Sequence, residues 1–316
     1  MKVLITTPWV KNYVENFRTD FPEVEFITGD SEADMVAAAG DCEIAFGPVS
    51  SAVLRAAESL RWIQSGSAGV EWMRETPELT ETEIIVTNTR GAHASTIAEH
   101  TFGMLVFLAR GFDSLYKAQM NHEWQRPLEK PGTGLVGLTM GIIGLGNIGR
   151  AIAERAVAFR MRVIAVDAHP VPKPDYVTEL GLLDGLDDLM GRADVVVVAT
   201  PITPETRGMI GPEQLRGMKS SAFLLVMSRG GIIHEPTLVD MLRNGQLAGA
   251  GLDVAETEPL PADSDLWDAP NIIITPHSSP SSSQTHNNVT AIMADNLKRY
   301  LAGEALYNVV DKKLGY

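Results

Sequence analysis

The sequence predicts an α/β protein built from two doubly wound parallel-sheet domains with a cleft between them. Short apolar runs that suit buried strands alternate with segments of helical character along most of the 316 residues. This alternation is typical of parallel sheets covered by helices on both faces. The spacing G-x-G-x-x-G, from Gly144 to Gly149, opens the second of two such arrays. The chain length also favours two domains.

The first array fills the N-terminal third of the chain. Its expected strands are 2–6, 24–28, 43–46, 60–64 and 83–87, and its expected helices lie within 10–19, 33–39 and 51–57. A longer helix is expected over 96–119, where Ile97, Thr101 and Leu105 mark one face. Its apolar face is broad, so the helix needs cover on several sides. A second subunit would provide this cover, and so would two domains of one chain.

A polar, turn-rich connection is expected over 121–137, because it contains prolines and several glycines. The second array follows, with expected strands at 140–143, 162–166, 194–199, 222–227, 250–254 and 272–275. Serines 281–283 precede a predicted C-terminal helix over 284–301, where they suit a helix cap.

The glycine motif predicts a dinucleotide site. Gly144 permits a tight turn, Gly146 lets the backbone approach a pyrophosphate, and Gly149 lets helix and strand pack closely. The following helix offers its N-terminal N–H groups to phosphates, and Asp167 ends the next strand, where its carboxylate suits the ribose hydroxyls. A glycine-rich turn without a ligand is the alternative. It is disfavoured because strand, helix and acid stand in the order that a Rossmann-like unit requires.

Three further strands each end in a group of chemical use beside a nicotinamide. Arg229 follows one strand, Asp253 and then Glu258 follow another, and His277 follows a third. Arg229 suits a carboxylate and its adjacent carbonyl, and His277 suits proton exchange with a hydroxyl. Glu258 would orient the imidazole and favour its cation. Each residue alone is more often structural, but together they predict hydride transfer to C2 of a 2-oxo acid.

Composition narrows the class of protein. The formal net charge is −14 and no basic run occurs, which argues against nucleic acid as a partner. The single cysteine, Cys42, excludes an intramolecular disulfide and suits a reducing compartment. We expect no signal peptide, no membrane span and no metal, and hence a cytoplasmic protein.

The motifs together resemble those of the D-isomer-specific 2-hydroxyacid dehydrogenase family, in order and at suitable spacing. The matching segments are Gly144–Gly149, Thr200–Thr206, Ser228–Gly231, Asp253 to Pro259 and Thr275–His277. The resemblance implies that Arg229 anchors substrate, that His277 is the acid/base and that Glu258 is its partner. It implies cofactor contacts from Gly144, Gly146, Asn147, Ile148, Gly149, Asp167, Thr200, Pro201, Thr206, Met227, Ser228 and Asp253, the last of which would hold the carboxamide.

The resemblance also bears on domains and assembly. The family's C-terminal helix returns to the N-terminal domain, so we expect a discontinuous substrate domain, 1–97 plus 284–316, and an NAD-binding domain, 98–283. The family pairs subunits through the long helix, which implies a homodimer through 96–119. Ser67, Ala68 and Gly69 match the family's substrate loop, where their N–H groups would form an anion nest. Without the family, that segment is an ordinary flexible turn.

Two segments stay open. After His277 the family usually has a small-residue turn with glycine, whereas this chain has Ser-Ser-Pro280, so backbone contacts to the cofactor there are in question. Arg90 either reaches a substrate anion or forms a surface ion pair, and the second is favoured.

The predicted function is therefore an NAD-dependent oxidoreductase acting on a small 2-oxo or D-2-hydroxy acid. NAD is favoured over NADP because Asp167 would repel a 2′-phosphate and no arginine follows it directly. The alternative is an NAD-sensing binding protein of the same fold, similar to the corepressors that share it.

Overall fold

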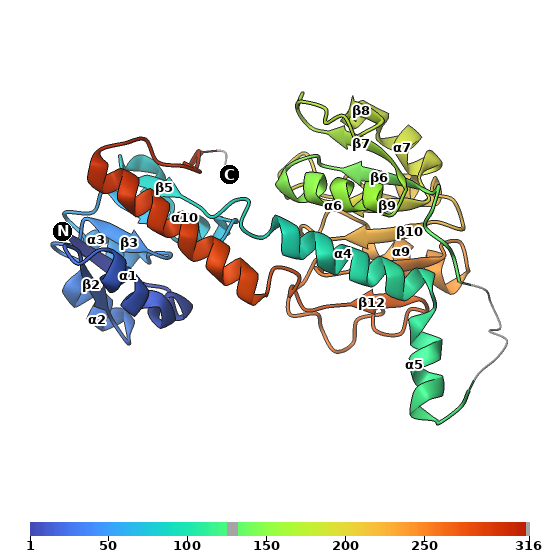
Figure 1. Cartoon of the computed structure of the whole chain (residues 1–316), viewed down its shortest axis with the longest axis horizontal. Coiled ribbons are helices and arrows are strands. Elements are labelled where there is room, and N and C mark those ends of the chain that lie inside the picture. Colours follow the sequence, from blue (N-terminus) through green and yellow to red (C-terminus); the bar gives the residue numbers. More distant parts are fainter. Residues whose placement is uncertain (125–131, 314–316) are drawn as a thin grey trace. The chain divides into compact units, whose positions relative to one another are not determined.

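The computed structural model describes residues 1–124 and 132–313 (Figure 1). The chain forms two compact units: unit 1 is Met1–His93 with Ser282–Tyr316, and unit 2 is Ala94–Ser281. The sequence led us to expect boundaries after residues 97 and 283. The boundaries fall slightly earlier because helix α4 begins at Ala94 and Ser282 caps helix α10.

Unit 1 contains a five-stranded parallel sheet with the order β2-β1-β3-β4-β5. Its strands are β1 (Lys2–Ile5), β2 (Glu25–Thr28), β3 (Ile44–Phe46), β4 (Trp62–Gln64) and β5 (Ile85–Thr87). The register aligns Val3 with Ile44 and Ile44 with Trp62. Its helical elements are η1 (Pro8–Tyr13), α1 (Val14–Asp20), α2 (Glu32–Ala38), α3 (Ser51–Ala56), η2 (Glu71–Glu75), η3 (Pro77–Glu81) and α10 (Ser283–Ala302).

Helix α10 belongs to unit 1 although it lies at the far end of the chain. Figure 1 shows it in red alongside the blue strands of this unit. Val289, Met293 and Leu297 are buried in the same core as the strand residues of β1 and β3. A buried hydrogen bond also ties α10 to the sheet, because Asn296 Nδ2 donates to Gln64 Oε1 of β4 at 2.8 Å.

Unit 2 contains a seven-stranded parallel sheet with the order β12-β11-β10-β9-β6-β7-β8. Its strands are β6 (Thr139–Ile143), β7 (Arg162–Asp167), β8 (Glu179–Leu182), β9 (Val195–Val198), β10 (Phe223–Val226), β11 (Gly249–Leu252) and β12 (Ile272–Ile274). Its helical elements are α4 (Ala94–Ala109), α5 (Phe112–Met120), α6 (Asn147–Ala158), η4 (Leu183–Gly185), α7 (Leu186–Arg192), α8 (Pro212–Arg216) and α9 (Glu235–Arg243).

Both faces of the central strands of this sheet are buried, which explains why strands such as β9 and β10 are continuous apolar runs. In β9, Val195 and Val197 contribute to the core that α4 and α6 cover. Val196 and Val198 contribute to the core on the other face, with helices α7 and α9. The order reverses between β6 and β9, and ligands of open α/β sheets bind at such a point, beyond the carboxyl ends of the strands.

The single helix expected over 96–119 is wrong. The structure has two helices, α4 and α5, separated at Gly111, whose φ is +62°. Glycine adopts this left-handed conformation without steric cost, so the helix ends there and the chain turns. Figure 1 shows α5 leaving α4 in a new direction. Of the expected connection over 121–137, residues 125–131 lie outside the described residues.

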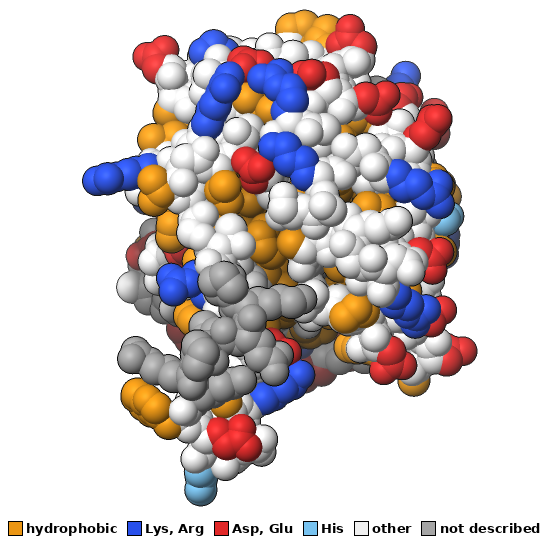
Figure 2. All heavy atoms as spheres, turned by 90° about the vertical axis from the view of Figure 1, so that its right-hand side faces the viewer, with side chains coloured by type: hydrophobic (Ala, Val, Ile, Leu, Met, Phe, Trp, Pro, Cys, Tyr) orange, Lys and Arg blue, Asp and Glu red, His pale blue; other side chains and the backbone are white. Residues whose placement is uncertain are grey.

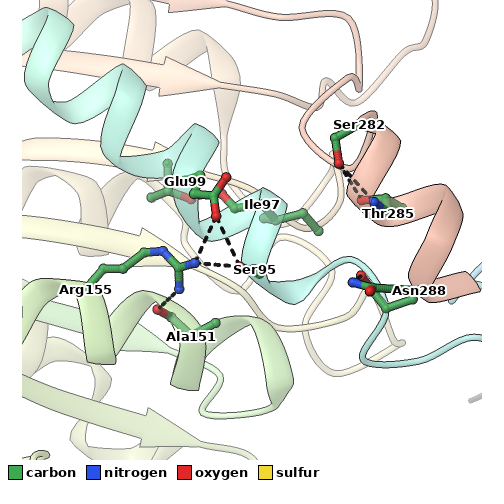
Figure 3. Close-up of polar contacts among 10 residues, drawn as sticks. Ser95, Ile97, Glu99, Ala151, Arg155, Ser282, Thr285 and Asn288 are labelled. Carbon is green, nitrogen blue, oxygen red and sulfur yellow. Dashed lines mark hydrogen bonds and ion pairs between the residues drawn. The ribbon is translucent and has the colours of Figure 1, made fainter.

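Charges are mixed on the face of unit 2 seen in Figure 2, where Lys and Arg side chains lie among Asp and Glu side chains. An ion pair of this kind joins two helices: Arg155 on α6 contacts Glu99 on α4 at 3.2 Å and donates to Ser95 Oγ at 2.6 Å (Figure 3). Among the helices that the structure describes, none has the length and apolar character needed to cross a membrane.

Candidate active site

The glycine turn joins β6 to α6. Gly144 has φ +95°, and a Cβ built there would lie 2.8 Å from the Thr200 backbone nitrogen. A Cβ at Gly149 would lie 2.1 Å from the carbonyl oxygen of Gly144. In contrast, a Cβ at Gly146 would have no described heavy atom within 4 Å. Two glycines are thus required by the protein's own packing, whereas Gly146 keeps clear the space in front of α6.

Helix α6 begins with Asn147 and Ile148. Its N-cap residue is Gly146, so no side chain caps the helix. At the end of β7, the Asp167 carboxylate accepts the Leu145 N–H at 2.7 Å and the His169 N–H at 3.1 Å. The carboxylate therefore stands beside the glycine turn, as the dinucleotide motif predicts.

The segment after β9 is a tight turn. The Thr206 hydroxyl donates to the Pro201 carbonyl at 2.7 Å and accepts the Thr203 N–H at 2.8 Å. Thr200 and Thr206 are both buried. These contacts fix the turn beside Gly144. They do not test the cofactor contacts expected of Thr200, Pro201 and Thr206, which stay predictions.

Strand β10 leads into Met227, Ser228 and Arg229. Met227 and Ser228 are buried, and among the described residues the buried Ser228 Oγ has no hydrogen-bond partner. The Arg229 guanidinium donates to the Ser228 carbonyl at 2.7 Å. The next residue, Gly230, packs tightly, because a Cβ there would lie 1.9 Å from the Ala255 carbonyl oxygen. The Arg229 turn therefore lies against the segment that follows β11.

That segment carries Glu258. The Glu258 carboxylate accepts the Ala255 N–H through Oε1 at 3.1 Å, and its Oε2 lies 2.8 Å from His277 Nδ1. Both side chains are 39% exposed, so the pair is open to a small molecule. The structure thus brings together the acid and the imidazole that the sequence predicts as partners.

A neighbouring carboxylate also holds the segment that carries Glu258. Glu235, the first residue of α9, accepts the Glu256 N–H at 2.6 Å. Burial raises the pKa of Glu235, and the nearby charge of Glu256 also raises it.

His277 has an unusual backbone. Its φ is +51°, and its N–H donates to the Asp253 carbonyl at 2.7 Å. The Asp253 carboxylate, which is almost completely buried, accepts the Ser278 N–H at 2.9 Å and the Ser279 N–H at 3.1 Å. A non-glycine residue in this region persists only where its surroundings hold it. Asp253 is therefore engaged with the backbone that carries His277, and its expected contact with a carboxamide stays a prediction.

The candidate substrate loop lies in unit 1, after β4. The Ser67 N–H already donates to Ser65 Oγ at 3.2 Å, and the Ala68 carbonyl accepts Asn88 Nδ2 at 2.9 Å. Ser67 and Ala68 are exposed, and Gly69 is half-buried. Arg90 lies two residues after Asn88 and is exposed. Neither an anion nest over residues 67–69 nor a role for Arg90 is decided by these contacts.

The residues present fit a dinucleotide. The open space at Gly146, the uncapped start of α6 and the Asp167 carboxylate lie at neighbouring strand ends, and Ser228 offers a buried hydroxyl. Sequence reasoning missed His100, which lies on α4 and whose Nε2 is 3.0 Å from Thr275 Oγ1. The periodicity of α4 showed only its apolar face, and no local signal pairs residues so far apart in the chain.

Comparison with known proteins identifies the family of this chain. Residues 102–279 match the family model described as "D-isomer specific 2-hydroxyacid dehydrogenase, NAD binding domain". A D-3-phosphoglycerate dehydrogenase of Methanocaldococcus jannaschii is 34% identical over 98% of this chain and 59% of its own length. A glyoxylate reductase of Korarchaeum cryptofilum is 35% identical over 84% of this chain and 81% of its own length. The chain thus spans little more than half the length of the phosphoglycerate dehydrogenase.

A solved structure covers the whole fold. The D-isomer specific 2-hydroxyacid dehydrogenase family protein of Aeromonas salmonicida subsp. salmonicida A449 superposes with a TM-score of 0.85, at 31% identity and over 98% of both chains. The two parallel sheets, the glycine turn, the Glu258–His277 pair and these matches lead to one conclusion: the chain belongs to the D-isomer specific 2-hydroxyacid dehydrogenase family.

Proposed function

We propose that this protein is an NAD-dependent oxidoreductase that interconverts a small 2-oxo acid and the corresponding D-2-hydroxy acid. The observation that carries the proposal is the 2.8 Å contact between His277 Nδ1 and Glu258 Oε2, at the strand edge that holds the glycine turn. An imidazole oriented by a carboxylate is suited to general acid–base catalysis. Family membership supports the same activity.

Each residue has a role in this proposal. Bound NADH would supply the hydride. Because Glu258 occupies Nδ1, the Nε2 of His277 is the atom that donates a proton to the substrate oxygen or accepts one from it. Arg229 binds the substrate carboxylate and polarises the carbonyl beside it, since its planar fork matches both oxygens. We propose further that Ser67, Ala68 and Gly69 of unit 1 offer N–H groups to a substrate carboxylate, as the resemblance to the family implies.

The activity is tested by NADH oxidation at 340 nm with a panel that includes glyoxylate, hydroxypyruvate, branched 2-oxo acids and 3-phosphohydroxypyruvate. His277→Ala should lower turnover by about 10²–10⁴-fold and keep NADH affinity, because it removes only the proton transfer. His122→Ala is a matched control, since His122 is also exposed and has φ +62°. Turnover near wild type in the His277 variant would exclude the assigned acid/base, and NADH binding without turnover on any acid would favour an NAD-sensing protein.

NAD is the proposed cofactor. Asp167 stands at the end of β7 with both carboxylate oxygens directed to backbone N–H groups, so its negative charge is held in place. A 2′-phosphate at that position would be repelled by on the order of 1 kcal/mol or more. The kinetic test compares NADH with NADPH at equal concentration. Equal or faster turnover with NADPH would reverse this assignment.

We also propose a homodimer through 96–119. Large apolar side chains on α5 support it, because Phe112, Tyr116 and Met120 are 44%, 60% and 62% exposed. Such exposed apolar surface is often an interface. Light scattering should give twice the mass of the chain, and Met120→Glu should shift the mass toward the monomer. A wild-type protein with the monomer mass would exclude this assembly.

A further inference from the structure

A hydrogen-bonded chain leads from α4 to the backbone that carries His277. His100 Nε2 lies 3.0 Å from Thr275 Oγ1, and the Thr275 hydroxyl donates to Asp253 Oδ1 at 2.5 Å. His100 is 25% exposed, whereas the Asp253 side chain is 1% exposed. The distance from His100 Nε2 to Asp253 Oδ1 is 3.9 Å, so the hydroxyl of Thr275 is the link between them.

The proton positions follow from this geometry. A threonine hydroxyl has one hydrogen, and here it is donated to Asp253. The Thr275 oxygen is then an acceptor toward His100, so His100 carries a hydrogen on Nε2. The contact therefore requires one ring tautomer, or the cation, and His100 donates in both.

Among the described residues, the hydrogen bonds that Asp253 accepts come from the segment that surrounds His277. Its carboxylate accepts from Thr275 on one side of His277 and from Ser278 and Ser279 on the other, and its carbonyl accepts the His277 N–H. His277 stands between these anchors in a left-handed conformation that needs support. If the Thr275 anchor moved, the imidazole would lose its alignment with Glu258.

We propose that His100 is a positioning residue for His277, acting through the Thr275 hydroxyl and the Asp253 carboxylate; the effect on turnover rests on the proposed function. His100 holds Thr275 in the rotamer that donates to Asp253, and Asp253 in turn fixes the backbone of residues 277–279. His100 itself does not touch the substrate in this scheme.

The test uses three variants and a matched control. Thr275→Val and His100→Leu remove the link, and His100→Gln keeps an N–H donor at a similar reach. Thr101→Val is the control, because Thr101 is the next residue of α4, is fully buried, and donates its hydroxyl to the Ile97 carbonyl of its own helix. Amide hydrogen exchange of Ser278 and Ser279 is measured without substrate or cofactor, and turnover and NADH affinity are measured separately.

We expect the first two variants to speed exchange at Ser278 and Ser279 by about 10- to 100-fold, since a buried acceptor loses a donor. Turnover should fall about 10-fold or more, with NADH affinity within about threefold of wild type. His100→Gln should restore both quantities to within about threefold of wild type, and Thr101→Val should match wild type.

The inference is overturned if exchange at these two amides is unchanged in His100→Leu. It is equally overturned if His100→Gln is as impaired as His100→Leu, or if Thr101→Val has the same effect, which would mean that α4 is simply destabilised. A wild-type protein without turnover on any 2-oxo acid would refute the proposed function, while the exchange data would still decide the network.

Discussion

Substitutions in the glycine turn should separate folding from cofactor binding. Alanine at Gly149 would place its Cβ 2.1 Å from the Gly144 carbonyl oxygen, more than 1 Å closer than an ordinary contact. Helix α6 would have to move away from β6, and such overpacking costs about 1–3 kcal/mol. For a unit of this size, each kcal/mol lowers the melting temperature by about 2–4 °C. Gly149→Ala should therefore melt about 2–12 °C below wild type.

Alanine at Gly146 should behave in the opposite way. A Cβ there meets no described heavy atom within 4 Å, and the residue has φ −75°, which alanine adopts without strain. The free energy of unfolding without cofactor should stay within about 0.5 kcal/mol of wild type. The methyl group would occupy the space in which we propose that the pyrophosphate binds. A clash of about 1–3 kcal/mol corresponds to roughly 5- to 150-fold weaker NADH binding.

The assay combines thermal unfolding without cofactor and titration of NADH by its fluorescence, on both variants and wild type. The reasoning fails at the cofactor step if Gly146→Ala binds NADH as tightly as wild type. It fails at the packing step if Gly149→Ala melts at the wild-type temperature. Loss of stability in Gly146→Ala would show that the space is needed by the protein itself.

Three further predictions concern side chains outside the glycine turn. Burial raises the pKa of the Cys42 thiol to about 11, so at pH 8 it should react with a thiol reagent about 10²-fold more slowly than an exposed cysteine; fast reaction of the folded protein would contradict this. Burial raises the pKa of Glu235, so the stability that its protonated form contributes is present at low pH and is lost as pH rises above the ordinary glutamate value. In urea unfolding, the free energy of unfolding of Glu235→Gln should therefore rise relative to that of wild type between pH 4.5 and 7.5. A difference that stays constant with pH would refute this prediction. Arg155→Ala should lower the free energy of unfolding by at most about 1 kcal/mol, measured by urea unfolding, because the side chains of its ion pair with Glu99 (Figure 3) are 27% and 65% exposed.

Much of the fold could be predicted because parallel strands are buried on both faces. Runs such as 195–198 and 223–226 are apolar at every position, and they stand out without any periodicity. Strand β8 was missed because it lies at the sheet edge, with its residues half-buried or exposed and a glycine within it. The break at Gly111 was missed because Phe112 continues the apolar pattern, so the change of direction depends on backbone conformation rather than on hydrophobicity.

In the candidate site, too, some contacts could be predicted from the sequence and others could not. Residues at strand ends, such as Glu258 and His277, could be predicted to meet because parallel strands place their carboxyl ends at one edge. The partners of Asp253 could not be predicted, since a carboxylate after a strand suits a ligand and a backbone anchor equally well. The contact between His100 and Thr275 joins residues 175 positions apart, and a single sequence carries no signal for such a pair.

The place of α10 constrains the order in which the chain acquires its structure during synthesis. Residues 94–281 form an uninterrupted unit and have all their sheet partners once they leave the ribosome. The earlier residues 1–93 must wait, because Val289, Met293 and Leu297 complete their core and Val310 donates to the Val86 carbonyl beside the outermost strand. Residues 1–93 are thus translated before residues 94–281 but complete their core after them, and until then their apolar surface is exposed.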